Sequence, residues 1–271
     1  MVIFGKLTRA LVLGFCVTAG VPGGAFAAPL QLASHQAVYD LKLESLSETG
    51  GLEDVRGRIV LKIEQHCDGL IVNQRMVLEL VNVQGGTVIS DYVQSTWEDN
   101  SGKTMRFDMS NMLNGKTVEK YRGVAKHEKD KTTVTFSEPD KEEMDLPASV
   151  IFPGEHTREL LAAATKGKSL LSTKIFDGNG DNGLSDTLAV IGKEKTFADP
   201  AKVTEKLDGL KYWPLQISFF DLRERQTEPD YEIVMKMFEN GVASDLLLKY
   251  QDFTLSGKMK ELKFFNTEKC S

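Results

Sequence analysis

The chain has 271 residues, 41% of them hydrophobic, and its 33 Lys and Arg against 39 Asp and Glu give a formal net charge of −6. This hydrophobic content is ordinary for a folded globular protein, and the acidic balance argues against a nucleic-acid partner and against electrostatic docking on anionic lipid headgroups. No linker or repeat divides the chain, so we expect a signal peptide at residues 1–27 and a single domain at residues 28–271.

The first 28 residues have the three zones of a secretory signal. Lys6 and Arg9 give a positive start, residues 10–21 are apolar, and Ala25-Phe26-Ala27 supplies small residues for cleavage. We expect cleavage after this triplet or one residue later, which leaves a periplasmic protein of net charge −8 because two basic residues are lost. The apolar run is shorter than the roughly 20 residues of a membrane span. An uncleaved anchor is the alternative, and no later stretch predicts a transmembrane segment.

The three cysteines divide between the signal and the mature chain. Cys16 lies in the signal, and the bulky Phe15 before it does not fit a lipoprotein cleavage site. Cys67 and Cys270 remain, and they allow one pairing. An oxidising compartment favours a disulfide between them, with two separate buried thiols as the alternative.

Short runs in residues 36–150 alternate between apolar and polar positions, which is typical of half-buried strands. One face of the first clear run carries Ile59, Leu61 and Ile63, and the next carries Met76, Leu78 and Leu80. Pairs that suit tight hairpin turns separate the runs: Asp68-Gly69, Gly85-Gly86 and Asn114-Gly115. Polar loops are expected at residues 98–103 and 127–131.

One segment, residues 154–164, predicts a helix, with Pro153 before it and Gly167 suited to its C-terminal cap. Strands then resume at residues 169–176, 187–192, 213–222, 231–238 and 243–265. The apolar positions of the last run change phase near Gln251-Asp252, which predicts a bulge or sharp bend there.

So many sequential strands with one helix predict a mainly β fold. A sheet of this size curls or closes. We therefore expect a strongly curved antiparallel sheet that forms an open barrel or β-spiral around one helix, in a single domain.

Motifs for metal, phosphate and catalysis are incomplete. His156 and Glu159 have helical spacing, but the second histidine of the helical zinc motifs is missing. Residues 177–183 begin like a calcium loop, yet Asn182 stands where glycine is required, so a glycine-rich hairpin loop is the stronger interpretation. Gly167-Lys168-Ser169 lacks the rest of a phosphate loop. We expect no metal site, no cofactor and no catalytic residue.

Two carboxylate pairs, Glu98-Asp99 and Glu138-Asp140, are the candidates for acid–base catalysis in a hydrolase of envelope polymers. Adjacent residues of a strand point to opposite faces, so Glu98 and Asp99 would not share a substrate. Both pairs also fit polar loops. The hydrolase is therefore the alternative to a binding module, together with a purely scaffolding role.

Several ordered motifs run through the mature chain. They include residues 35–41 (HQAVYDL), Cys67-Asp68-Gly69, Trp97-Glu98-Asp99, residues 152–157 (FPGEHT), Glu239-Asn240-Gly241-Val242 and the terminal Cys270. In this order they resemble the EipB cell-envelope-integrity family of alphaproteobacterial periplasmic proteins. The resemblance implies a non-enzymatic open β-barrel or β-spiral, similar in shape to lipoprotein carriers that hold acyl chains. It also implies that the family's paired cysteines correspond to Cys67 and Cys270.

The expected function is a binding module whose concave face holds an apolar guest. The expected guest is the acyl chain of a lipid or lipoprotein, or a hydrophobic segment of a periplasmic protein partner. Flexible methionine side chains suit a variable apolar guest, and the candidate lining residues are Met76, Leu78, Leu80, Met235 and Met237. The alternative is that these residues pack on the helix around Leu160 and Leu161 as ordinary core.

Overall fold

The computed structural model describes residues 31–47, 51–198, 201–222, 227–266 and 270. The predicted signal peptide, residues 1–27, lies outside the described residues. The described part is mainly β, as predicted. Its first strands are β1 (His35–Leu46), β2 (Leu52–Gln65), β3 (Gly69–Asn82), β4 (Thr87–Asp99), β5 (Thr104–Leu113), β6 (Lys116–His127), β7 (Lys131–Glu138), β8 (Glu143–Pro147) and β9 (Val150–Ile151).

The helix α1 (Pro153–Thr165) follows, and most of the remaining elements are strands. These are β10 (Leu170–Phe176), β11 (Leu184–Ile191), β12 (Lys195–Thr196), β13 (Lys211–Asp221), β14 (Tyr231–Phe238), β15 (Ala243–Tyr250) and β16 (Phe253–Phe264). Two short 3₁₀ helices, η1 (Gly180–Gly183) and η2 (Lys202–Leu207), interrupt them.

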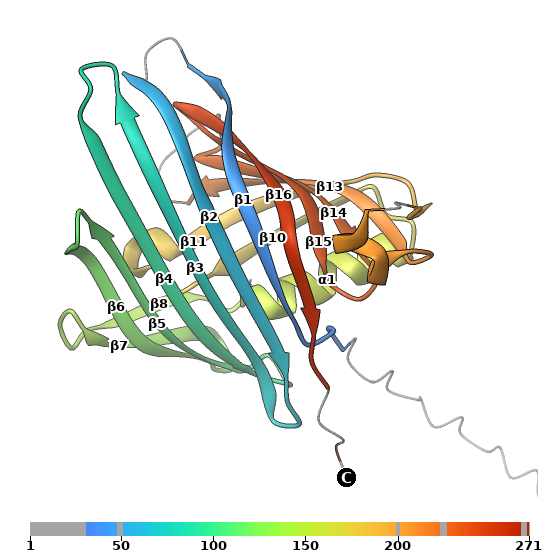
Figure 1. Ribbon diagram of the computed structural model, residues 1–271. Coiled ribbons are helices and arrows are strands. Elements are labelled where there is room, and N and C mark those ends of the chain that lie inside the picture. The colour runs from blue at the N-terminus through green and yellow to red at the C-terminus, as the bar shows by residue number, and fades with distance from the viewer. Residues whose placement is uncertain (1–30, 48–50, 199–200, 223–226, 267–269, 271) are drawn as a thin grey trace, which may run out of the picture.

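All strands belong to one sheet that almost closes on itself. Its order is β8-β7-β6-β5-β4-β3-β2-β1-β16-β15-β14-β13-β11-β10-β9, with β12 beside β13. The first and last strands, β1 and β16, are therefore neighbours in its middle. Its two ends, β8 and β9, are joined by only two residues, which span at most about 10 Å. Figure 1 shows the long β2–β4 strands on one side and β13–β15 on the other. This confirms the strongly curved, open-barrel sheet.

Helix α1 lies inside the curved sheet. Its Leu160 and Leu161 share a buried cluster with Ile63 and Leu70 from one side of the barrel and Trp213 from the other. The helix begins at Pro153, one residue earlier than predicted, and the proline occupies its first turn. Gly167 ends the helix at φ +71°, and its N–H donates to the carbonyl of Ala164 at 2.9 Å. Glycine tolerates this left-handed conformation without strain.

The predicted hairpins are present, with two corrections. The run at residues 243–265 is two strands, because Lys249 pairs with Thr254 across a reversal at Gln251 and Asp252. The phase change therefore marks a hairpin turn, so the predicted sharp bend is confirmed and the alternative of a bulge was wrong. Gly69 has no positive φ. It is glycine because a Cβ there would lie 2.3 Å from the carbonyl oxygen of Glu98.

Candidate functional site

The inner face of the sheet carries the five predicted ligand-binding residues, but in two separate clusters. Met237 belongs to the cluster of Leu160 and Leu161, and Met235 packs against it. Leu78 belongs to a second cluster that Met76 and Leu80 adjoin. Leu78 and Met237 are each 5% exposed, so they are core residues. The other three are half-buried and keep inner surface open to solvent.

Aromatic side chains that the sequence analysis did not single out extend this inner face. Tyr231 pairs with Phe219 of β13 and with Tyr250 of β15. Its ring stacks on Phe219 at 4.3 Å between centroids and on Tyr250 at 6.3 Å. On the opposite side of the barrel, Tyr92 of β4 lies beside Met76 of β3. The three tyrosines are half-buried, so each presents part of an aromatic ring to the barrel interior.

The loop between β10 and β11 contacts the same interior. Gln94 on the inner face of β4 donates from Nε2 to the carbonyl of Asp177 at 2.7 Å. A Cβ on Gly178 would meet the ring of Phe107 at 2.7 Å, and one on Gly180 would meet Tyr121 at 2.4 Å. The loop therefore packs against β4–β6, and the predicted glycine-rich hairpin loop is confirmed.

Asp177 brings a carboxylate to this aromatic surface. Its Oδ1 accepts the N–H of Asn179 at 2.9 Å, and burial raises the pKa of Asp177 to about 6. Burial, and then the charge of Asp177, raise the pKa values of Tyr92 and Tyr231. Protein atoms crowd these side chains enough to desolvate them, yet each side chain is only half-buried. A concave surface produces this combination. The inner face thus combines methionine, aromatic and a few polar groups.

A second inner-face feature is the buried carboxylate of Glu98. Its oxygens accept the N–H of Gly154 at 2.8 and 3.0 Å, and Oε2 accepts that of Glu155 at 3.3 Å. These N–H groups have no partner within the helix, and the helix dipole favours a negative group beside them. Desolvation raises the pKa of Glu98 to about 7.

The carboxylate pairs do not form facing partners. Glu98 is 0% exposed inside the barrel, whereas Asp99 is half-buried and accepts the N–H of Ser101 at 2.8 Å. The expectation that Glu98 belongs to a polar loop was wrong, because β4 continues to Asp99. Glu138 ends β7 on the outer surface, where it pairs with Arg122 at 2.8 Å.

The two mature-chain cysteines are joined at one end of the barrel. Cys67 lies in the β2–β3 turn and forms a disulfide with Cys270, with 5.4 Å between their Cα atoms. Asn100, in the β4–β5 turn, donates from Nδ2 to the carbonyl of Cys67 at 2.8 Å. The disulfide ties the C-terminus to an early hairpin.

The metal-ligand candidates lie apart. His156 is 5% exposed, with Nε2 3.4 Å from the Thr187 hydroxyl, and burial lowers its pKa to about 4. Glu159 lines a shallow groove on the other side of the helix with Glu155 and Arg158. Over the described ranges, no three His, Cys, Asp or Glu side chains gather as metal ligands would. Within the same ranges, no helix is long and apolar enough to cross a membrane.

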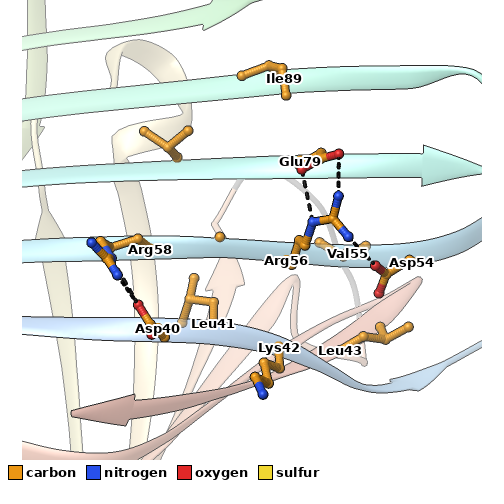
Figure 2. Close-up of a pocket in the computed structure, with 12 residues that line it drawn as sticks. Asp40, Leu41, Lys42, Leu43, Asp54, Val55, Arg56, Arg58, Glu79 and Ile89 are labelled. Atoms are coloured by element: carbon orange, nitrogen blue, oxygen red, sulfur yellow. Dashed lines mark hydrogen bonds and ion pairs between the residues drawn. The ribbon is translucent and has the colours of Figure 1, made fainter. Parts of the chain in front are cut away.

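A groove of about 670 Å³ lies on the outer face of β1–β4. Figure 2 shows Arg58 paired with Asp40, and Arg56 held between Glu79 and Asp54. Three acidic and three basic side chains line it: Asp40, Asp54, Glu79, Lys42, Arg56 and Arg58. Their charges balance, and both arginines pair with the three acidic groups, so the groove offers little to a charged ligand. The inner face is the better candidate site.

The nearly closed sheet, the enclosed helix and the accessible inner face define a barrel-like β protein with a concave interior. The chain belongs to the EipB-like family, whose model matches residues 26–266. It is 34% identical over 256 residues to the cell envelope integrity protein EipB of Brucella abortus (strain 2308), covering 93% of this chain and 91% of that protein. It is also similar to the crystal structure of a β-barrel-like protein of a domain of unknown function from Brucella abortus. That match has a TM-score of 0.81 and 31% identity, and covers 88% of this chain and 100% of the other.

Proposed function

We propose that this chain is a non-enzymatic periplasmic protein that supports the integrity of the cell envelope by holding a lipid or lipoprotein acyl chain in its barrel. The relationship to a cell envelope integrity protein supports the role in the envelope. The secretory pattern of residues 1–27 and the Cys67–Cys270 disulfide support the periplasm, because disulfides persist in oxidising compartments.

The observation that carries the binding proposal is the incomplete packing of the inner face. Met76, Met235 and Tyr231 lie on the inner face and are only half-buried, although they adjoin fully packed clusters. Apolar surface left in water is unfavourable by about 25 cal/mol per Å², so a guest that covers it gains that free energy. An acyl chain matches this surface because it needs few polar partners.

The experiment is uptake of a fluorescent fatty acid by the purified mature protein. Micromolar or tighter binding supports the proposal, and its absence refutes it. A hydrophobic segment of a periplasmic protein partner is the second guest to test. An unlabelled amphipathic peptide that displaces the fatty acid would show that both occupy one surface, and a peptide that binds alone would replace the acyl proposal.

A further inference from the structure

A second groove lies on the outer face of the barrel, on the far side of the sheet from the interior. It has a volume of about 540 Å³ and is lined by residues of β3 to β7. These strands lie toward the left of Figure 1. This size is within the range of small-ligand sites. Unlike the groove of Figure 2, its lining includes a tryptophan, Trp97, and more basic than acidic side chains.

The strand register builds the groove from two rows of outward side chains. One row crosses the strands through Ile71, Trp97, Arg106, Val124 and Thr135, each paired with the next. The neighbouring row is polar: Ser95 pairs with Asp108, and Asp108 with Arg122, while Ser137 completes the lining. The groove therefore has one mostly apolar wall and one polar wall.

Arg106 carries the net charge of this groove. Arg122 is neutralised, because it contacts Asp108 at 2.6 Å and Glu138 at 2.8 Å. In the described part of the chain, the contact of the Arg106 side chain is with Trp97, its guanidinium carbon lying 5.0 Å from the ring centroid. Arg106 is exposed, so its N–H donors face solvent. The contact with the indole restrains the guanidinium, whose planar fork can bind a carboxylate through two parallel hydrogen bonds.

We propose that this outer groove binds a saccharide that bears a carboxylate. The carboxylate pairs with Arg106, and the C–H face of the sugar ring lies against the half-buried indole of Trp97 and Ile71. The sugar hydroxyls find partners in the polar row, where Ser95 and Ser137 offer hydroxyls and Asp108 a carboxylate. The groove thus offers one mostly apolar wall, one cation and several small polar groups. A sugar ring that carries a carboxylate has matching C–H, anionic and O–H surfaces.

The sheet itself disfavours an extended peptide in this groove. β4, β5 and β6 are each paired on both sides, so their backbone groups already have partners. A peptide strand could not add main-chain hydrogen bonds here, and these bonds give most of the affinity in strand addition. A saccharide needs only the side chains of the face.

The test uses the two tryptophans of the chain as internal reporters. Trp97 lines the outer groove, whereas Trp213 is 3% exposed inside the barrel. The indole N–H signals of the ¹⁵N-labelled mature protein are followed by NMR during titration with N-acetylmuramic acid. N-acetylglucosamine, which lacks the lactyl carboxylate, is the matched neutral probe.

The expected result is a saturable shift of the Trp97 signal with the acid, at least tenfold weaker binding of the neutral sugar, and an unchanged Trp213 signal. Arg106→Gln should weaken binding of the acid at least tenfold, and Arg106→Lys should weaken it less. Arg75→Gln removes an outer-face arginine that pairs with Asp91 outside this groove, and should change nothing. Equal binding of the two sugars, no shift with either, or an effect of Arg75→Gln equal to that of Arg106→Gln would overturn the proposal. An acyl guest in the barrel would instead move Trp213, so the two sites report separately.

Discussion

The carboxylate of Glu98, at the end of β4, accepts the backbone N–H of Gly154 in the first turn of α1, at 2.8 and 3.0 Å. This contact ties the helix to the wall of the barrel. The cap residue Phe152 offers no side-chain acceptor, so a distant strand performs the capping role. Burial is the dominant influence on this carboxyl, and it raises the pKa of Glu98 to about 7.

Glu98 should make stability fall as pH rises from about 4.5 to 7. Below pH 4.5 the carboxyl is protonated in both states. Between these values the folded protein holds the proton more tightly than the unfolded chain, so the free energy of unfolding decreases with pH, and above 7 the loss is complete. The free energy of unfolding lost over this pH range is on the order of 3 kcal/mol.

Denaturant titrations of the wild type and Glu98→Gln from pH 4 to 8 check this dependence. The variant keeps an oxygen acceptor but does not titrate, so the difference between the two curves isolates Glu98. His156, whose pKa burial lowers to about 4, titrates in the same window in both proteins and cancels. Parallel curves would contradict the assignment.

The Cys67–Cys270 disulfide should stabilise the domain strongly. It closes a loop with a sequence separation of 203 residues, worth about 5 kcal/mol in the chain-entropy model. Cys67→Ser, Cys270→Ser and the double variant should each lower the melting temperature by roughly 5–15 °C. Peptide mapping without reductant should find the cross-linked pair. Free thiols in the periplasmic protein, or a double variant much less stable than either single one, would sink this prediction.

Met235→Glu should abolish acyl binding, because it places a charge on the half-buried inner face of β14. Val234→Glu is the matched control, since the neighbouring residue of a strand points to the outer face. We expect the control to bind the fluorescent fatty acid like the wild type. If Met235→Glu unfolds the protein while Val234→Glu does not, Met235 is core and the lipid-binding proposal loses its main support.

Chelators should leave the melting temperature unchanged. His156 is buried against Thr187, and Glu159 faces another side of α1, so the pair does not converge on one ion. The loop of Asp177 is held by its own backbone and by Gln94. A fall in melting temperature with chelator that calcium or zinc reverses would show that a metal is bound.

The sequence predicted the sheet well where local patterns determine it. Alternation placed Met76, Leu78 and Leu80 on one face, and the pair Asn114-Gly115 adopts the positive φ angles, +50° and +75°, that its turn requires. The curvature also followed from the number of strands. These features depend on residues that are neighbours in the chain, so the sequence predicts them without knowledge of tertiary contacts.

The site was less predictable because its parts come from distant strands. Glu98 looked like a loop residue, although Tyr92, Gln94 and Thr96 show that the inner-face alternation continues to it. Its partner, Gly154, is 56 residues away. The pairing of Tyr231 with Phe219 and Tyr250 depends on the strand register, which single runs do not reveal. The groove of Trp97 and Arg106 likewise appears only once β4 and β5 are paired.

Native mass spectrometry of protein purified gently from the periplasm tests the central claim most directly. We predict a mature chain that begins at Ala28 or Pro29 and carries additional mass, which organic extraction removes and identifies as a lipid or lipoprotein acyl chain. The Met235→Glu protein should lack this mass, and the Val234→Glu protein should retain it. A wild-type protein that is folded and carries no acyl ligand in any preparation would contradict the account.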